Sequence, residues 1–183
     1  MTDVNSNPVS GVSVTFAVTA GGGAIDPVSP ASVVTNASGV ATLTSWTLGT
    51  IAGANTVTAT VAGLTGSPVT FTATGTAGVA TTIAAVSTLT QSATISTDVS
   101  APPSVLVTDA NGNPVSGVSV TFALTGGGGA IVPVSPATIV TNASGIATLT
   151  SWTVGAVPGA NTVTATVAGL AGSPVTFTAT GIP

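Results

Sequence analysis

The chain has 183 residues, no Lys, Arg, His or Cys, and four acidic side chains that give a net charge of −4. Proteins bind nucleic-acid phosphates through Lys and Arg, so this composition excludes nucleic acid as a partner. It also excludes disulfides, and it leaves Asp as the one common general acid or base, so we expect no enzyme.

Hydropathy gives no sign of a membrane segment, although its mean is +0.73. Thr, Ser, Gly, Asn or Pro interrupts every apolar run before the ~18 residues that a membrane-spanning helix requires. The opening residues, MTDVN, have neither the basic region nor the apolar stretch of a secretory signal. We therefore expect no membrane insertion and no signal peptide in this sequence.

The sequence repeats itself. A shift of 106 positions aligns residues 2–75 with residues 108–181 without a gap, and 13 of these 74 positions differ. That period matches the length of a whole domain and exceeds the roughly 20–45 residues of a solenoid repeat. We therefore predict two copies of one domain, at residues 1–76 and 77–183.

The two copies begin differently. Residues 77–107 precede the aligned part of the second copy, and no comparable segment precedes the aligned part of the first in this sequence. The first domain is therefore predicted to lack its opening strands and to expose part of its core. Either the sequence is a window from a longer array, or another chain fills the gap by adding strands.

Alternating apolar residues predict the strands in both copies. In the first copy the apolar sets are Val12, Val14, Phe16 and Val18, then Val57, Ala59 and Val61, then Val69, Phe71 and Ala73. In the second copy, strands are expected at residues 81–87, 104–108, 117–125, 137–141, 145–153, 161–168 and 173–181. Turn sequences such as Asn111-Gly112 separate them.

Seven or eight short strands in about 100 residues, each with one apolar face, are typical of an immunoglobulin-like β-sandwich. The expected fold class is therefore all-β, with tandem immunoglobulin-like sandwiches, the first lacking its N-terminal strands. Large aromatic side chains on such strands are expected to fill the core. The predicted core residues are Phe16, Trp46, Phe71, Phe122, Trp152 and Phe177.

One short motif resembles the first half of a calcium-binding loop. Asp109, Asn111 and Asn113 have the alternating spacing of calcium ligands. Such a loop also needs Gly at its sixth position and Glu at its twelfth, whereas Pro114 takes the sixth position and the chain has no Glu. A turn closed by an Asx hydrogen bond is the favoured interpretation. Weak calcium binding is the alternative, and no other cofactor is expected.

The segments VTDANGNPVSGVSVTFALTGG, TNASGIATLTSWTVG and GANTVTATVAG resemble the bacterial immunoglobulin-like repeats of the invasin and intimin type. The resemblance covers the second copy and every segment that the first copy possesses. It implies a structural module, the stalk or spacer of a large bacterial adhesin-like protein, located at the cell surface or secreted. Its partners would be the neighbouring immunoglobulin-like repeats.

Two other functions remain open. Natural sheets protect their edges with Lys and other charges, which this chain almost lacks, so its domains could associate with copies of themselves in an extracellular filament or sheath. Thr alternates along several strands, and such ladders could instead bind carbohydrate or ice. The usual reason for Thr at these positions is that β-branched residues suit the exposed face of a strand.

Overall fold

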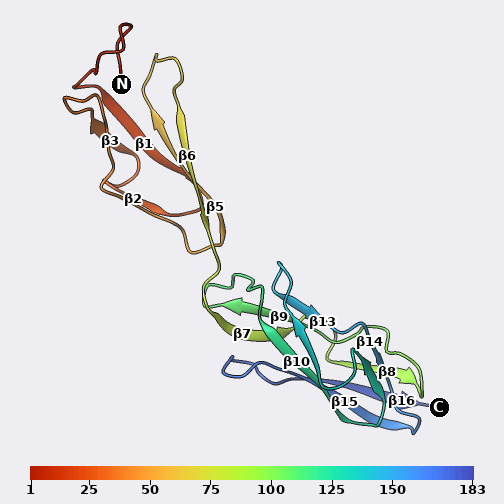
Figure 1. The fold of residues 1–183 in the computed structure, drawn as a ribbon. Coiled ribbons are helices and arrows are strands. Elements are labelled where there is room, and N and C mark those ends of the chain that lie inside the picture. Colours follow the sequence, from red (N-terminus) through yellow and green to blue (C-terminus); the bar gives the residue numbers. More distant parts are fainter. The chain divides into compact units, whose positions relative to one another are not determined.

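The computed structural model describes residues 1–183 and contains sixteen β-strands and no helix. The expected all-β class is therefore confirmed. The chain divides into two compact units, Met1–Thr76 and Ala77–Pro183, here called unit one and unit two (Figure 1). No helix is present that could cross a membrane.

Unit two is a sandwich of ten strands. In chain order they are β7 (Ala80–Ala85), β8 (Thr90–Thr94), β9 (Ser104–Asp109), β10 (Ser119–Gly126), β11 (Ala130–Val132), β12 (Ala137–Val140), β13 (Ile146–Thr148), β14 (Ser151–Thr153), β15 (Gly159–Thr166) and β16 (Val175–Ile182). The main sheet has the order β12-β10-β15-β16-β8, a second sheet has the order β13-β9-β7, and β11 pairs with β14.

The segment at residues 77–107, here called the opening segment, contributes to both main sheets of unit two. It supplies β7 and β9 to the three-stranded sheet and β8 to the edge of the five-stranded one. Strand β9 pairs antiparallel with β13, whereas β8 pairs parallel with β16. The opening segment therefore adds strands to both main sheets of this unit.

Alternating burial follows the alternating sequence, because successive side chains on a strand point to opposite faces. Along β16, Val175, Phe177 and Ala179 are buried, while the Thr residues between them are exposed or half-buried. Strand β15 has the same alternation, with Val163 and Ala165 on the buried face. The strands predicted at residues 161–168 and 173–181 are therefore confirmed.

The structure departs from the predicted strands at three places. Residues 145–153 were expected to form one strand but form β13 and β14, which pair with β9 and β11. The chain changes sheet between them, and Leu149 and Trp152 both enter the core. Strands β8 and β11 were not predicted, because β8 has no fully buried residue and β11 has only three residues.

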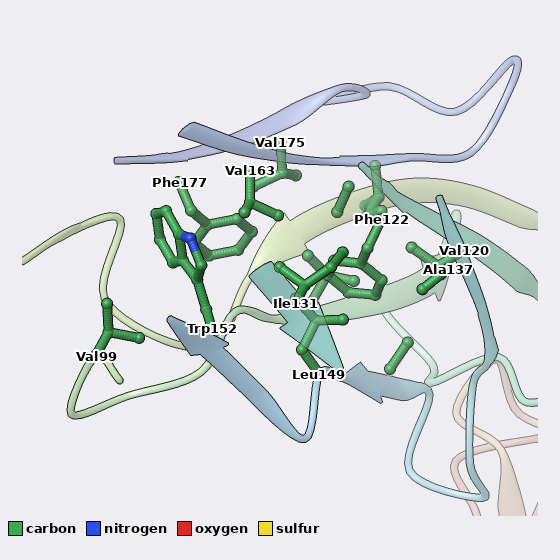
Figure 2. Packing of buried hydrophobic residues seen from close by; sticks show 14 of the residues in the cluster. Val99, Val120, Phe122, Ile131, Ala137, Leu149, Trp152, Val163, Val175 and Phe177 are labelled. Atoms are coloured by element: carbon green, nitrogen blue, oxygen red, sulfur yellow. The ribbon is translucent and has the colours of Figure 1, made fainter. Parts of the chain in front are cut away.

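The core of unit two lies between its sheets. Figure 2 shows Trp152, Phe122 and Phe177 within one cluster of aliphatic side chains. All three aromatic side chains have no exposed surface. The cluster also includes Ile83, Val105 and Val107 from the opening segment. The opening segment is therefore part of the core as well as of the sheets.

Unit one repeats this fold without an opening segment. Its strands are β1 (Ser13–Ala20), β2 (Ala24–Asp26), β3 (Ala31–Val34), β4 (Ser45–Thr47), β5 (Gly53–Thr60) and β6 (Val69–Gly75). They form one sheet of order β3-β1-β5-β6 and a short pair, β2-β4. Residues 40–42, which correspond to β13, form no strand. The reason is that β13 pairs with β9, and unit one has no counterpart of β9.

The core of unit one is smaller, and two of the expected core residues differ from their counterparts. Phe16 is buried, but Trp46 is half-buried and Phe71 is 47% exposed. Their counterparts Trp152 and Phe177 are completely buried. Phe71 thus departs from its expected core position, because nothing in unit one covers the face on which it lies.

Candidate functional site

The carboxylate of Asp109 is held by four N–H donors. Its Oδ1 accepts hydrogen bonds from the backbone N–H groups of Asn111 at 2.8 Å and Asn113 at 2.9 Å. Its Oδ2 accepts from the backbone N–H of Gly78 at 2.7 Å and from Nδ2 of Asn113 at 2.9 Å. Together these donors favour the ionised carboxylate and lower the pKa of Asp109 to about 2, with Asn113 contributing most.

This loop therefore has the geometry of a hydrogen-bonded Asx turn. Calcium takes oxygen ligands, whereas the groups that face the Asp109 carboxylate are N–H donors. The structure brings Asp109 and Asn113 together, and Asn111 contributes its backbone N–H. No group of three or more His, Cys, Asp or Glu side chains is placed to hold a metal ion. Weak calcium binding stays a prediction and would have to displace these donors.

The corresponding loop of unit one has one donor fewer. Asp3 accepts from the backbone N–H groups of Asn5 and Asn7 at 2.8 Å each and from Nδ2 of Asn7 at 3.0 Å. These bonds lower the pKa of Asp3, with the Asn7 side chain contributing most. The missing donor is the counterpart of Gly78, which belongs to the opening segment. In unit two, the loop that begins at Asp109 thus binds the opening segment through the hydrogen bond from Gly78.

The two carboxylates of each unit lie in different parts of its fold. In unit two, Asp98 accepts a hydrogen bond from Oγ1 of Thr153 at 2.5 Å, while Asp109 lies in the turn with Gly78. Asp3 lies in the opening loop of unit one, and Asp26 ends β2. Acid–base pairs such as the aspartic dyad require carboxylates that share one site.

Threonines line the outer face of the larger sheet in unit two. Thr138, Thr121 and Thr166 lie side by side across β12, β10 and β15. Thr162 lies opposite Thr178, which in turn lies beside Thr90 on β8. Open sheets twist, so these rows follow a curved surface. The arrangement supplies hydroxyl groups but no concave polar site.

The open face of unit one is the most distinctive surface of the molecule. It comprises the side chains that in unit two lie beneath the opening segment. Its central aromatic and aliphatic residues are Phe16, Leu43, Trp46, Val57 and Phe71, and they line a shallow apolar hollow. A second hollow beside it is lined by Val14, Ala59, Val61, Leu64 and Val69, among others.

Residues of the open face are more exposed than their counterparts in unit two. Val69 is 50% exposed, whereas its counterpart Val175 is 8% exposed. Leu43 is half-buried, whereas Leu149 is 1% exposed. Sequence comparison of the two copies predicts this difference, because only the second contains an opening segment. It does not predict which side chains become exposed.

Residues 100–180 match the sequence profile of a family described as bacterial Ig-like domain (group 1). No curated protein sequence matches the chain. The resemblance of unit two to bacterial immunoglobulin-like repeats is thus confirmed. Residues 2–75 of unit one repeat residues 108–181 with 13 differences.

Two solved structures of bacterial proteins are similar in fold. One is FdeC, described as a broadly conserved Escherichia coli adhesin, with a TM-score of 0.61 and 20% identity over 98% of this chain and 55% of that one. The other is InvD of Yersinia pseudotuberculosis, with a TM-score of 0.58 and 23% identity over 100% of this chain and 50% of that one. The chain thus spans about half the length of each. At 20% and 23% identity, this similarity shows a shared fold alone.

Proposed function

We propose that the chain is a structural module of a bacterial adhesin-like protein, a spacer that works outside the cell or at its surface. The observation that carries this proposal is the tandem repetition of one bacterial Ig-like domain at a period of 106 residues. A spacer can gain length by repeating a domain that has its own core, because each copy folds as a separate unit. The similarity in fold to an Escherichia coli adhesin supports the adhesin-type setting.

The chemistry of the surface supports a passive role. The side chains of both units include no Lys, Arg, His, Cys, Tyr or Glu, which removes most acid, base and nucleophilic groups. The four carboxylates are dispersed, and two of them are engaged in Asx turns. A module with few acid, base or nucleophilic side chains is suited to holding other domains at a distance.

Small-angle X-ray scattering of tandem arrays tests the spacer. Arrays of two, four and six copies of residues 76–181, one full period, would be compared at equal mass concentration. A spacer predicts that the maximum dimension increases by a constant step per copy. A maximum dimension that grows only as the cube root of copy number would mean that the units collapse onto one another, and it would contradict the role.

A second candidate is a self-assembling extracellular filament. It is favoured by the near absence of charge, since Lys and other charged residues are the usual protection against edge-to-edge association of sheets. Sedimentation velocity over a concentration series separates the two candidates. The spacer predicts one species at all low micromolar concentrations, whereas the filament predicts ordered polymers at those concentrations.

A further inference from the structure

We propose that copies of this chain associate through the free edge of strand β12, which pairs antiparallel with the same edge of a second copy. The matching strand of unit one is β3, which also lies at the end of its sheet, so the chain carries two such edges. This inference rests on the second candidate function, the self-assembling filament, and it names the surface that joins the copies.

Strand β12 has β10 on one side and no strand on the other. Successive residues of an antiparallel strand direct their backbone N–H and C=O groups alternately toward and away from the neighbouring strand. The N–H of Thr141 donates at 2.9 Å to the carbonyl of Val118, which precedes β10, so Ile139 faces β10 as well. Thr138 and Val140 therefore direct their backbone groups outward, where an added strand would meet them.

The edges of the three-stranded sheet in unit two are occupied by the chain itself. Beside β7, Ala171 accepts a hydrogen bond from the N–H of Ile83 and donates one to the carbonyl of Thr81, each at 2.9 Å. Beside β13, the carbonyl of Ile146 accepts from the N–H of Asn142 at 3.0 Å, and the N–H of Ile146 donates to Oδ1 of Asn142 at 3.1 Å. These edges are therefore less available than β12.

The opposite edge of the five-stranded sheet, β8, is less suited to strand pairing by its sequence. Strand β8 reads TQSAT and has β-branched residues only at its two ends, whereas β12 reads ATIV and has three in succession. Such residues fit the pleated surface of a sheet, and Gln, Ser and Ala fit it less well. Strand β12 is therefore the edge that an additional strand should prefer.

The β12 edge is complementary to itself. When two β12 strands pair antiparallel about Ile139, Thr138 of each copy lies opposite Val140 of the other. Both residues direct their backbone groups outward, so each pair exchanges two hydrogen bonds. Their side chains are exposed, so each pair also brings two β-branched side chains together. The arrangement has two-fold symmetry, in which one patch serves both copies.

The composition of the edges favours a second copy as the partner. Natural edges are protected by Lys and other charges, by Pro or by bulges. The sequences ATIV of β12 and ASVV of β3 contain no charge and no Pro, and their pairing with β10 and β1 has no bulge. Val140 is 55% exposed and Val34 of β3 is 58% exposed. A charged partner would gain no ion pair here, whereas an uncharged copy meets no repulsion.

Two edges on each chain allow association to continue beyond a dimer. Strand β3 has the same geometry as β12, because the N–H of Thr35 donates to the carbonyl of Val12 at 2.9 Å and Val34 therefore faces outward. One pairing of two such short strands supplies only about four hydrogen bonds and is weak. A chain that joins one copy at β3 and another at β12 forms a polymer.

Sedimentation velocity of the full 183-residue chain and its edge variants tests the proposal. Val34→Lys and Val140→Lys each place a charge beside one edge, at a residue that is more than half exposed. We expect the double variant to raise the concentration needed for association by ~10-fold or more, since an edge lysine is the usual protection against pairing. Val140→Lys alone leaves the β3 edge free, so it should associate into dimers and no further.

Matched variants separate the edge from a general effect of charge. Thr60→Lys together with Thr166→Lys adds the same charge to exposed positions on the central strands β5 and β15, and it should associate within about twofold of the unmodified chain. Val140→Pro removes one outward N–H without adding a charge, so it should weaken association as Val140→Lys does. Ser92→Lys changes the opposite edge, β8, and should leave association unchanged.

The outcomes distinguish this inference from the filament on which it rests. Polymers that persist in the edge double variant would show that another surface joins the copies, which would overturn the β12 edge and leave the filament standing. Equal loss of polymers in the Thr60 and Thr166 double variant, or loss caused by Ser92→Lys alone, would overturn it in the same way. An unmodified chain that stays monomeric throughout the concentration series would contradict both the edge and the filament.

Discussion

At the scale of single residues, the two units provide an internal comparison, because identical side chains occupy different surroundings. Phe177 has no exposed surface, whereas Phe71 is 47% exposed. Both lie on the apolar face of the last strand of their unit and pair with a valine of the preceding strand, Val163 or Val57. The difference in burial therefore arises from the cover above them and not from local sequence.

This comparison predicts unequal costs for the same substitution. Phe177→Ala should lower the free energy of unfolding of unit two by about 3–5 kcal/mol, since it leaves a cavity in a filled core. Phe71→Ala should lower that of unit one by only about 1 kcal/mol, since half of the ring already faces solvent. Differential scanning calorimetry of the two variants measures both effects. Equal losses would show that the open face is covered in solution.

The low pKa of Asp109 predicts that the stability of unit two depends on pH. Its pKa in the folded chain is about 2, below the ordinary value of 3.8, so the folded form binds fewer protons than the unfolded chain between these values. The contribution to stability is complete above about pH 4 and is lost as the pH falls toward 2. The free energy of unfolding of unit two, measured at a series of pH values from 7 to 2, should show this loss.

An Asp109→Asn variant tests the cause of that acid dependence. The amide nitrogen of Asn would meet N–H donors of Gly78 or Asn113, so the variant should be less stable at pH 7 and less sensitive to acid. Asp26→Val is the matched control, because unit two itself has Val132 at that position. A control variant that changes unit two as strongly as Asp109→Asn would contradict the assignment.

At the scale of strands, most of the fold could be predicted from alternating residues. Strands such as β10 and β16 have one apolar face, and β15 has one that is interrupted by Asn161 alone; this alternation is the signal that sequence carries best. Strand β8 was missed because its sequence, TQSAT, has no such face. It is held by backbone pairing with β16 and by Gln91, whose side chain donates to the carbonyl of Ala101 at 2.7 Å.

The open face could be predicted only in outline. The absence of an opening segment before the first copy indicates an uncovered core, and the structure places that opening over β6 and residues 40–42. Which residues become exposed depends on where the opening segment runs in unit two. That path includes one parallel and two antiparallel pairings that no local pattern specifies.

Amide hydrogen exchange should reveal the two unpaired edges. In unit two, the N–H of Leu149 donates to Pro103 and that of Thr178 donates to Leu89, both in the opening segment. Unit one has no counterpart of either acceptor. The amide hydrogens of Leu43 and Thr72 should therefore exchange faster than those of their counterparts Leu149 and Thr178, by a factor on the order of 100 or more. Similar protection in both units would show that something already occupies the edges.

At the scale of the whole molecule, the two units share one fold and differ in completeness. Unit two has a continuous core that includes the opening segment, whereas unit one has a smaller cluster centred on Phe16 and Val57. Stability rises with the apolar area that a domain buries. Unit one should therefore be the weaker of the two, and heating should unfold the chain in two steps.

The most direct test of this account is calorimetry of the chain after a second copy of residues 77–107 is placed before Thr2, in the position that it has before Thr108. We predict that the unmodified chain has a low and a high transition. The added segment should raise the low transition close to the high one and should leave the high one unchanged. A low transition that stays where it was would show that the open face does not accept the opening segment, and it would contradict the account.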